Sequence, residues 1–214
     1  MWISKLVLNP ASRAVRKDLL NPYEMHRTLC RAVSTALKEG RERLLWRLEP
    51  TRPHERPVIL VQTLTEPDWQ ALEPGYAEAF PPRLFEPALR AGQVLTFRLR
   101  ANPSKRLRAT KKRVALRTRS EKVDWLSRRL KSGGFLLLET KEGPLVDIVQ
   151  DTLLKAYRKK QEESGSQEGH QLLVQAVLFQ GHLEVVDPAL ARTTLERGIG
   201  PGKALGLGLL SLCP

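Results

Sequence analysis

The sequence predicts an α+β protein with two tandem units, each an antiparallel sheet with helices on one face. Three observations support this fold class. The 214 residues are enough for two domains of about 100 residues each. The content of 41% hydrophobic and 28% charged residues is typical of a packed globular chain. Candidate strands and helices follow each other in the same order in both halves, which predicts an architectural repeat without sequence identity.

The first half contains the clearest helix signal, over residues 22–38. Asn21 can cap this helix, Pro22 suits its first position, and Glu24 completes the spacing of a capping box. Gly40 marks its end. The other expected segments are strands at 2–8, 43–48 and 58–64, a short helix at 68–72, and a closing strand between Tyr76 and Phe85 that nearby prolines make irregular.

The second half begins at Val94, where apolar and polar residues alternate up to Arg100 with the period of a half-buried strand. A helix capped by Ser120 follows, and it ends at the glycines after Ser132. The polar run 161–169 is expected to form the tip of a hairpin. The remaining expected segments are strands at 135–139, 145–154, 172–179, 183–186 and 207–212, and a helix that opens at Asp187-Pro188 and stops at Gly198.

Strand, helix, strand, strand, helix and strand is the order of a ferredoxin-like (RRM-like) domain, and both halves fit it. We expect residues 1–90 to form the N-terminal domain, which carries the helix at 22–38. Residues 91–214 are expected to form the C-terminal domain, with a basic surface, an extra hairpin and a glycine-rich loop.

The positive charge of the chain is concentrated between Arg98 and Lys131. This stretch has fourteen Lys or Arg and two acids, Glu121 and Asp124, so it supplies +12 of the formal net charge of +13. A solvated face is the usual role of a charge run. At this density, however, uncompensated repulsion favours binding to phosphates. The predicted nucleic-acid contacts in the stretch are Arg98, Arg100, Lys105, Arg106, Arg108, Lys111, Lys112, Arg113, Arg117, Arg119, Arg128 and Arg129.

The low aromatic content narrows the kind of nucleic acid. Only 6% of the residues are Phe, Trp or Tyr, and none of the expected strands is rich in Phe or Tyr as in an RNA-recognition motif that stacks bases. Base stacking is therefore not the main mode of recognition. Structured RNA, held by its backbone and shape, fits better than a single strand.

Several classes of protein are disfavoured. No segment approaches the roughly 18 apolar residues of a membrane span, and the N-terminus lacks the apolar core of a signal peptide. We therefore expect a soluble, cytoplasmic protein with no membrane partner. Cys30 and Cys213 are too few for a disulfide framework, and we expect both to be free. No histidine pair has zinc-ligand spacing and no acids cluster as in a two-metal nuclease, so we expect no metal and no other cofactor.

The helix at 22–38 offers residues that could cut RNA. Steps of about 100° per residue place His26 at the edge of the buried stripe, and Tyr23, Arg27, Cys30 and Ser34 on the face next to it. An imidazole can take the proton of a ribose 2′-hydroxyl or protonate the leaving 5′-oxygen, and a cation can stabilise the charged phosphorane. The alternative is a boundary histidine that does no chemistry. The other histidines, His54, His170 and His182 at an expected turn beside Gly181, are predicted to be solvated loop residues.

A second candidate site is the glycine-rich segment 197–208, which has five glycines in the eleven residues 198–208. Glycine lets a backbone approach phosphates closely. The segment does not fit a nucleotide-binding P-loop, because Arg197 replaces the first required glycine and Ala204 replaces the hydroxyl that binds Mg²⁺. No nucleotide cofactor is expected. Two roles of this segment are possible at this point. It could be a tight turn packed against a neighbouring strand, or it could contact a phosphate through Gly200, Gly202 and Lys203. The presence of Lys203 favours the phosphate contact.

Three motifs in order resemble the CasE family of CRISPR RNA-processing endoribonucleases, and its thermophile members especially. They are Tyr23 with His26, the segment Phe97-Arg98-Leu99-Arg100-Ala101-Asn102-Pro103, and the segment Gly200-Pro201-Gly202-Lys203-Ala204-Leu205-Gly206-Leu207-Gly208. The resemblance covers essentially the full length. It implies two ferredoxin-like domains and metal-independent cleavage of a CRISPR repeat hairpin RNA at the base of its stem, with a 2′,3′-cyclic phosphate product. It also implies that the protein stays on the mature guide RNA as a subunit of the Cascade complex.

The resemblance assigns roles to particular residues. His26 would be the general acid or base and Tyr23 its partner. Arg27, Arg31 and Ser34 would support the phosphate. The family's basic hairpin, which enters the major groove of the RNA stem, would correspond to Arg158, Lys159 and Lys160.

Two other functions remain open at this point. The first is a non-catalytic RNA-binding or scaffold subunit of a ribonucleoprotein, which would use the same basic surface. The second is a sequence-independent DNA-binding protein, for which duplex DNA would compete as well as hairpin RNA.

Overall fold

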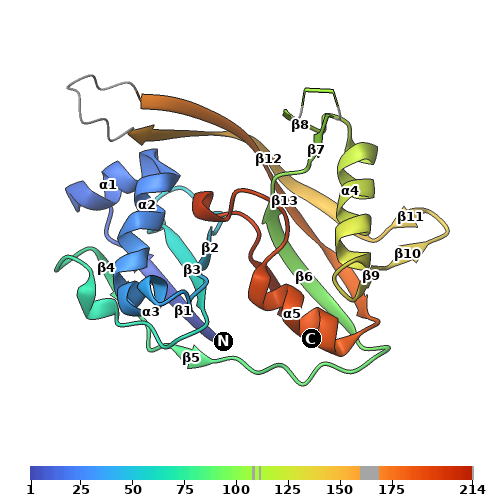
Figure 1. Ribbon diagram of the computed structural model, residues 1–214, viewed down its shortest axis with the longest axis horizontal. Coiled ribbons are helices and arrows are strands. Elements are labelled where there is room, and N and C mark those ends of the chain that lie inside the picture. Colours follow the sequence, from blue (N-terminus) through green and yellow to red (C-terminus); the bar gives the residue numbers. More distant parts are fainter. Residues whose placement is uncertain (108, 111, 160–168, 214) are drawn as a thin grey trace. The chain divides into compact units, whose positions relative to one another are not determined.

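A computed structural model describes residues 1–107, 109–110, 112–159 and 169–213. The chain forms the predicted α+β fold with two antiparallel sheets (Figure 1). It divides into two compact units that are each built from several chain segments. Unit 1 comprises Met1–Phe85, Leu153–Val174 and Ala204–Gly206, and unit 2 comprises Glu86–Thr152, Gln175–Lys203 and Leu207–Pro214.

The sheet of unit 1 has the strand order β2-β3-β1-β4, and β5 also pairs with β1. Every pairing is antiparallel, which is the order and direction of a ferredoxin-like sheet. The predicted closing strand is present as two short pieces, because the chain leaves β1 at Pro81-Pro82 between them. The strands are β1 (Trp2–Leu8), β2 (Leu45–Leu48), β3 (Val58–Thr63), β4 (Ala77–Ala79) and β5 (Arg83–Leu84).

The predicted single helix over 22–38 is wrong. The structure has α2 (Pro22–Leu29), a 3-10 turn η1 (Cys30–Val33) and α3 (Ser34–Lys38). The helical ladder breaks because the Ala32 carbonyl accepts a hydrogen bond from the backbone N–H of Asp68 at 2.9 Å, and Val33 turns to φ −134°.

A further helix of unit 1, α1 (Arg13–Leu20), is absent from the sequence-based prediction, although the Ser12 hydroxyl caps it by accepting from the Val15 N–H. The short helix near 68–72 is a 3-10 turn, η2 (Trp69–Ala71).

The core of unit 1 lies between its helices and its sheet. Side chains from α1, α2, β1, β2 and β3 meet there with almost no exposed area, and Tyr76 closes one end. The members include Leu6, Leu8, Val15, Met25, Leu29, Trp46, Ile59 and Val61. This packing fixes α2 on the sheet, since most helical stability in proteins comes from burial of one face.

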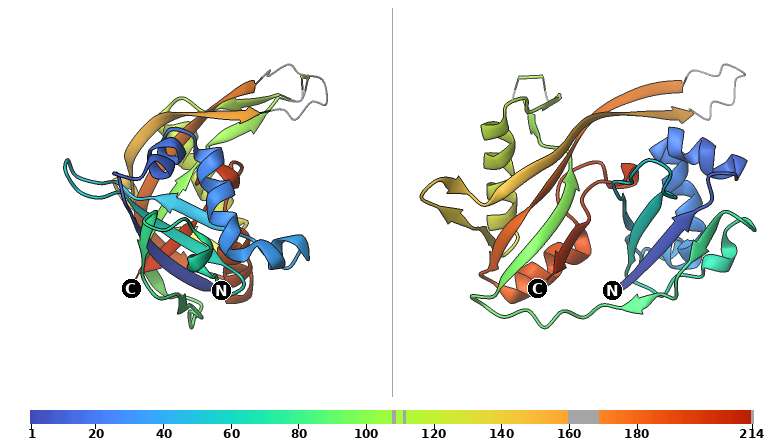
Figure 2. Two further views of the ribbon diagram at one scale, coloured as in Figure 1. Left: turned by 90° about the vertical axis from the view of Figure 1, so that its left-hand side faces the viewer. Right: turned by 180° about the vertical axis from the view of Figure 1, so that it is seen from behind.

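Unit 2 has the strand order β12-β13-β6-β14, with β9 pairing to β13. Helices α4 and α5 supply buried residues such as Leu126 and Leu195 to its core. The two longest strands, β12 and β13, extend beyond unit 2, since their segment Leu153–Val174 belongs to unit 1 (Figures 1 and 2). The elements are β6 (Val94–Ala101), β9 (Phe135–Leu137), β12 (Val146–Lys159), β13 (Gly169–Val185), β14 (Leu210–Cys213), α4 (Arg119–Lys131), α5 (Pro188–Arg197) and η3 (Lys203–Leu205), and the small ribbons are β7 (Ser104–Arg106) with β8 (Arg113–Ala115) and β10 (Glu139–Thr140) with β11 (Gly143–Pro144).

Two local predictions in unit 2 are corrected. The cap of α4 is Thr118 and not Ser120, because Thr118 forms a reciprocal capping box with Glu121. The turn expected at Gly181 is absent, and β13 continues through this residue without interruption. A Cβ on Gly181 would lie 2.2 Å from the Leu145 carbonyl oxygen, so glycine is needed there for close approach of the backbone at Leu145.

The predicted bounds of α5 are confirmed, with Asp187 as cap, Pro188 at the first position and Gly198 at the end. The final strand is shorter than expected and begins at Leu210. The hairpin tip expected at 161–169 falls almost wholly outside the described residues. Within the described part of the chain, none of the helices is both long and apolar enough to span a bilayer.

Candidate active-site helix and nucleic-acid interface

Helix α2 carries both predicted catalytic residues. Its first turn is set by sequence, since the Asn21 side chain accepts from the Tyr23 N–H at 3.3 Å and Pro22 occupies the first position. Met25 and Leu29 face the core, with at most 1% of their surface exposed. Tyr23 and His26 are three residues apart, so they lie one turn above each other on the same side of the helix. Both are half-buried at the edge of the core.

His26 lies in an apolar setting. Its Nε2 is 3.6 Å from Cys30 Sγ, and its Nδ1 is buried without a hydrogen-bond partner among the described residues. Burial lowers the pKa of the His26 imidazole below its usual value. The ring is therefore neutral at neutral pH, which is the form that can accept a proton.

Cys30 does not form a reactive pair with this histidine. Burial, together with the charge of Glu42, raises the pKa of the Cys30 thiol to about 11. A nucleophilic cysteine needs a lowered pKa. Cys30 therefore packs against His26 as a neutral thiol.

A buried hydrogen-bond network within unit 1 holds α2 in place. Asp18 on α1 is 5% exposed, and its Oδ2 accepts hydrogen bonds from Thr28 Oγ1 at 2.7 Å and from the Tyr76 hydroxyl at 2.8 Å. The Tyr76 hydroxyl also lies 3.1 Å from the sulfur of Met25. Burial and the neighbouring Asp18 raise the pKa of Tyr76, so it stays a donor. Two contacts on α2, at Met25 and Thr28, thus hold the helix in one rotation.

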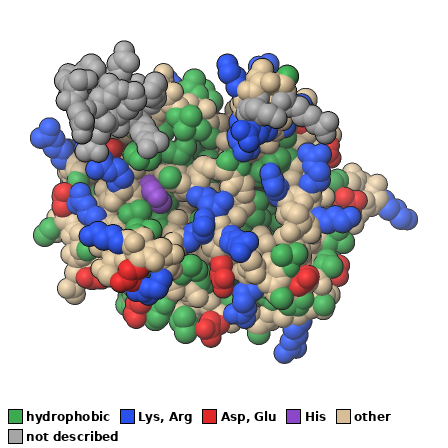
Figure 3. All heavy atoms as spheres, viewed as in Figure 1, with side chains coloured by type: hydrophobic (Ala, Val, Ile, Leu, Met, Phe, Trp, Pro, Cys, Tyr) green, Lys and Arg blue, Asp and Glu red, His purple; other side chains and the backbone are tan. Residues whose placement is uncertain are grey.

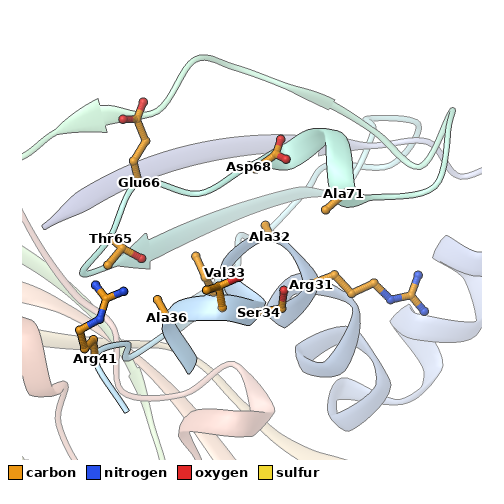
Figure 4. Close-up of a pocket in the computed structure, with 11 residues that line it drawn as sticks. Arg31, Ala32, Val33, Ser34, Ala36, Arg41, Thr65, Glu66, Asp68 and Ala71 are labelled. Atoms are coloured by element: carbon orange, nitrogen blue, oxygen red, sulfur yellow. The ribbon is translucent and has the colours of Figure 1, made fainter. Parts of the chain in front are cut away.

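The predicted supporting residues lie on three elements, Arg27 on α2, Arg31 on η1 and Ser34 on α3. The break after Leu29 puts Ser34 in α3, so the face assigned to it by uniform helical spacing is wrong. Arg31 and Ser34 instead line a cavity of about 390 Å³ in unit 1, together with Ala32, Val33, Thr35, Ala36, Arg41, Thr65, Glu66, Asp68 and Ala71 (Figure 4).

Both arginines near α2 already have acidic neighbours. The Arg31 guanidinium lies 3.7 Å from Glu73, and Figure 4 shows its side chain extending away from the other labelled residues. Arg27 is largely exposed and lies 3.2 Å from Glu24, one turn earlier on α2. Glu73 is also largely exposed, and exposed ion pairs contribute little and are easily exchanged for a phosphate partner, whereas only 17% of the Glu24 side chain is exposed.

The basic stretch 98–131 contributes to four elements of unit 2, β6, β7, β8 and α4. Arg98 and Arg100 alternate with buried Phe97 and Leu99 on β6, and Arg98 donates to Gln180 Oε1 at 3.1 Å. The predicted half-buried strand with a cationic outer face is therefore confirmed.

The ribbon β7–β8 opposes Arg106 to Arg113, and like charges directly across a ribbon repel each other. Arg113 donates to Ser104 Oγ at 3.3 Å. Figure 3 shows Lys and Arg side chains crowded over the part of unit 2 that carries β7, β8 and α4. Lys105, Arg106, Lys112, Arg113 and Arg117 are exposed, whereas Arg108 and Lys111 fall outside the described residues.

Helix α4 holds its cations in different ways. Arg128 is exposed, the guanidinium of Arg129 lies 5.8 Å from the ring centre of Trp125, and Arg119 donates to the Val146 carbonyl at 2.8 Å. Lys122 is 5% exposed and forms an ion pair with Asp151, so its charge is neutralised inside unit 2.

Glu121, one of the two acids of the stretch, does little to neutralise its exposed cations. Glu121 accepts from the backbone N–H groups of Arg117 and Thr118, which lower the pKa of its carboxyl group, and Lys105 lies 3.5 Å away. Its carboxylate is thus engaged mainly in capping α4. The exposed surface keeps a strong excess of positive charge.

In the glycine-rich segment, packing accounts for the glycines. Gly200, Gly202 and Gly206 have φ between +74° and +90°, which side chains rarely adopt. A Cβ on Gly200 would lie 3.0 Å from the Trp125 ring, and one on Gly206 would lie 2.8 Å from the Trp46 ring. The Lys203 ammonium donates to the Gly200 carbonyl at 2.7 Å. A tight packed turn is sufficient to explain the glycines, and a phosphate contact by Gly200, Gly202 or Lys203 stays a prediction.

The basic hairpin residues are only partly described. Arg158 and Lys159 end β12, and Lys160 lies outside the described residues. His182 is an exposed residue within β13 and not part of a turn, and His54 is an exposed loop residue as predicted. In the described part of the chain, no group of three or more His, Cys, Asp or Glu side chains is placed to hold a metal ion.

Sequence reasoning missed Asp18 and the second contact of Asn21. A lone aspartate in an amphipathic helix gives no signal of the distant hydroxyl, Tyr76, that it binds. Asn21 is recognisable as a helix cap, but its side chain also binds the backbone of Tyr157, 136 positions away.

Comparisons with known proteins agree over the whole chain. The model of a family described as CRISPR associated protein matches residues 1–214. The CRISPR-associated endoribonuclease Cse3 of Thermus thermophilus is 68% identical over 214 residues, which is all of both chains. A solved structure of Thermus thermophilus Cse3 bound to an RNA representing a pre-cleavage complex superimposes with a TM-score of 0.92 at 66% identity, over 100% of this chain and 98% of that one. The CRISPR system Cascade subunit CasE of Escherichia coli is 28% identical over the full length of both chains. The resemblance inferred from the motifs is therefore confirmed, and the chain belongs to the CRISPR-associated protein family that includes Cse3 and CasE.

Proposed function

We propose that this protein is an endoribonuclease that cleaves CRISPR repeat hairpin RNA at the base of the stem, without a metal ion, by attack of the ribose 2′-hydroxyl on the adjacent phosphate. The products are a 2′,3′-cyclic phosphate and a 5′-hydroxyl. The observation that carries the proposal is the full-length likeness, at 68% identity, to a relative named as a CRISPR-associated endoribonuclease.

His26 is the proposed proton acceptor. Its lowered pKa keeps the imidazole neutral at neutral pH, so it can take the proton of the 2′-hydroxyl as the new P–O bond forms. Tyr23, one turn earlier, orients the substrate or shares the proton transfer. The P–O bond to the 5′-oxygen then breaks, and that oxygen takes a proton as it leaves, either from the Tyr23 hydroxyl or from the imidazolium that His26 has become. No outside nucleophile is needed because RNA carries its own.

Arg27, Arg31 and Ser34 are proposed to stabilise the phosphorane. The Arg31–Glu73 pair is exposed on both sides, so a bound phosphate can replace Glu73 at small cost. The Arg27 side chain is itself 64% exposed, so a phosphate can reach it beside Glu24. The cationic elements β6, β7, β8 and α4 are proposed to hold the RNA backbone, because clustered exposed arginines and lysines release counterions when phosphates bind.

A second role, retention on the processed guide RNA as a subunit of a surveillance complex, is favoured by the likeness to the Escherichia coli Cascade subunit CasE. This role is compatible with cleavage, because an enzyme can cut one RNA molecule and then keep the product bound. A non-catalytic RNA-binding subunit would show the retention alone.

Repeat RNA with a single 2′-deoxy substitution at the proposed cleavage nucleotide tests the function. In EDTA we expect the unmodified RNA to be cut at the stem base, and the 2′-deoxy RNA to bind with the same affinity but stay intact. Binding of both RNAs without cleavage of either would overturn the nuclease proposal in favour of the non-catalytic role. Equal competition by duplex DNA would favour the DNA-binding alternative.

A further inference from the structure

Asn21 sits at a junction that the proposed chemistry does not use. Its backbone N–H closes α1 by donating to the Asp18 carbonyl at 3.2 Å, and its side chain opens α2 by accepting from the Tyr23 N–H. The residue itself is extended, with φ −137° and ψ 97°. It therefore sets the direction in which α2 leaves α1.

The same side chain makes two further hydrogen bonds to a single residue of β12. Asn21 Nδ2 donates to the Tyr157 carbonyl at 2.9 Å, and Asn21 Oδ1 accepts from the Tyr157 N–H at 3.2 Å. The amide thus pairs with Tyr157 as a neighbouring strand would. Strand β12 stands at the end of its sheet, so among the described residues no strand pairs with its outward N–H and C=O groups at Tyr157.

The pair joins two segments that have different tasks in the proposed reaction. Tyr157 directly precedes Arg158, Lys159 and Lys160, the basic residues assigned to the RNA stem. Asn21 lies two residues before Tyr23 and five before His26. All the atoms of the contact belong to unit 1, and the end of β12 and the start of α2 lie side by side in both figures (Figures 1 and 2).

We propose that the Asn21 amide is a positioning residue that fixes the hairpin of β12 and β13 in register with α2, and thereby selects which phosphate of the RNA lies at His26. The inference rests on the proposed nuclease function. Asn21 touches neither RNA nor reacting atoms in this role. It acts through Tyr157 on one side and through α2 on the other.

Two substitutions separate this role from helix capping. Asn21→Asp keeps a good cap for α2 and an acceptor for the Tyr157 N–H, but it sets a carboxylate oxygen against the Tyr157 carbonyl. Asn21→Ser also keeps a good cap, but a hydroxyl is too short and has too few groups to pair with both atoms of Tyr157. The matched control is Gln171→Ala, which removes the hydrogen bond from Gln171 Nε2 to the Tyr157 hydroxyl and leaves the backbone pair intact.

Single-turnover cleavage at saturating protein is the main measurement, with the cut positions mapped. We expect Asn21→Asp and Asn21→Ser to lower the rate constant about 10- to 100-fold, since a displacement of about 1 Å has that effect on oriented reactants. Cuts at neighbouring phosphates are expected to rise, while the affinity for 2′-deoxy hairpin RNA and the melting temperature stay close to those of the wild type. Gln171→Ala is expected to cut at the wild-type rate and position.

Hydrogen exchange at the Tyr157 amide reports the contact without any RNA. We expect slow exchange in the wild type and Gln171→Ala, slow exchange in Asn21→Asp, and fast exchange in Asn21→Ser. Wild-type cleavage rate and position in both Asn21 variants, or an equal loss in Gln171→Ala, would overturn the proposal. If the wild-type chain cleaves no RNA, the proposed function fails, and the exchange pattern then decides whether the contact at Tyr157 exists.

Discussion

Helix α2 and the basic stretch 98–131 hold their polar side chains in opposite ways. Around α2, hydrogen bonds to a carboxylate that is 5% exposed, Asp18, fix the backbone, and burial shifts the pKa of His26. In the basic stretch, most cations are exposed and have weak or exchangeable partners such as Glu121. Proton transfer needs atoms placed within a fraction of an ångström, whereas phosphate attraction acts over about 8–10 Å in physiological salt. The contrast indicates that chemistry and holding are assigned to different elements.

Removing the imidazole should have the largest effect. We expect His26→Ala to lower the single-turnover cleavage rate constant by about 10²- to 10⁴-fold, the usual contribution of a general acid or base. Affinity for 2′-deoxy hairpin RNA should change little, because the phosphates are held elsewhere. His182→Ala, at an exposed histidine of β13, is the control and should cut normally. Equal losses of affinity and rate in His26→Ala would break the division between the two regions.

Charge reversal should act on binding instead. We expect the double variant Lys112→Glu, Arg113→Glu to weaken RNA binding and to flatten the log–log dependence of affinity on salt by about one unit for each phosphate that the variant no longer binds. The cleavage rate at saturating protein should remain close to that of the wild type. Lys141→Glu, an exposed cation in the turn between β10 and β11, is the control for net charge. A salt dependence that is unchanged in the double variant would place the RNA on another surface.

The contribution of the Asp18 network to anchoring α2 can be tested by measuring the free energy of unfolding of variants. Tyr76→Phe removes one of the two hydroxyl donors of Asp18. Because the buried carboxylate of Asp18 then loses one donor and keeps the Thr28 hydroxyl, we expect the free energy of unfolding to fall by about 1–3 kcal/mol in urea titrations. Tyr157→Phe removes an exposed hydroxyl and should change it by less than about 0.5 kcal/mol. Equal stability of the two variants would mean that the Asp18 network does not anchor the helix.

The smallest expected effect is a pH dependence of stability from His26. Its pKa is lowered in the folded chain, so the unfolded chain binds more protons as pH falls below the usual histidine value of about 6.5. Stability therefore falls with decreasing pH in that window, by at most about 1.4 kcal/mol per pH unit from this group, and is flat with respect to it at higher pH. His26→Gln should remove this component in urea titrations between pH 5 and 7. An unchanged slope in His26→Gln would mean that burial does not disfavour the imidazolium.

Local signals predicted the elements whose causes are local. Asn21 and Pro22 start α2, alternation marks β6, and Asp187 with Gly198 bounds α5, as the sequence predicts. The break after Leu29 could not be predicted from helix periodicity, because its cause is a hydrogen bond from Asp68. The uninterrupted passage of β13 through Gly181 likewise involves a close approach to the backbone at Leu145, which lies far away in the sequence. Helix α1 is different, since its cap at Ser12 is a local signal that the sequence does contain.

For the candidate site, residue types could be predicted but their surroundings could not. The residue type of His26 is enough to make it a candidate catalytic residue. Its lowered pKa, however, results from burial, which depends on the fold. Charge density singled out the stretch 98–131, but it did not distinguish buried Lys122, paired with Asp151, from exposed Lys112.

The contact between Asn21 and Tyr157 can form only after both residues have left the ribosome. The two residues are separated by 136 positions. At about 5–20 residues per second, a ribosome needs roughly 7–27 s to reach Tyr157 after Asn21. Tyr157 belongs to the segment Leu153–Val174 of unit 1, and Ala204–Gly206 joins unit 1 later still, although the unit begins at Met1. The candidate catalytic helix therefore emerges long before the strand that Asn21 contacts, and unit 1 is completed only after Gly206 has been made.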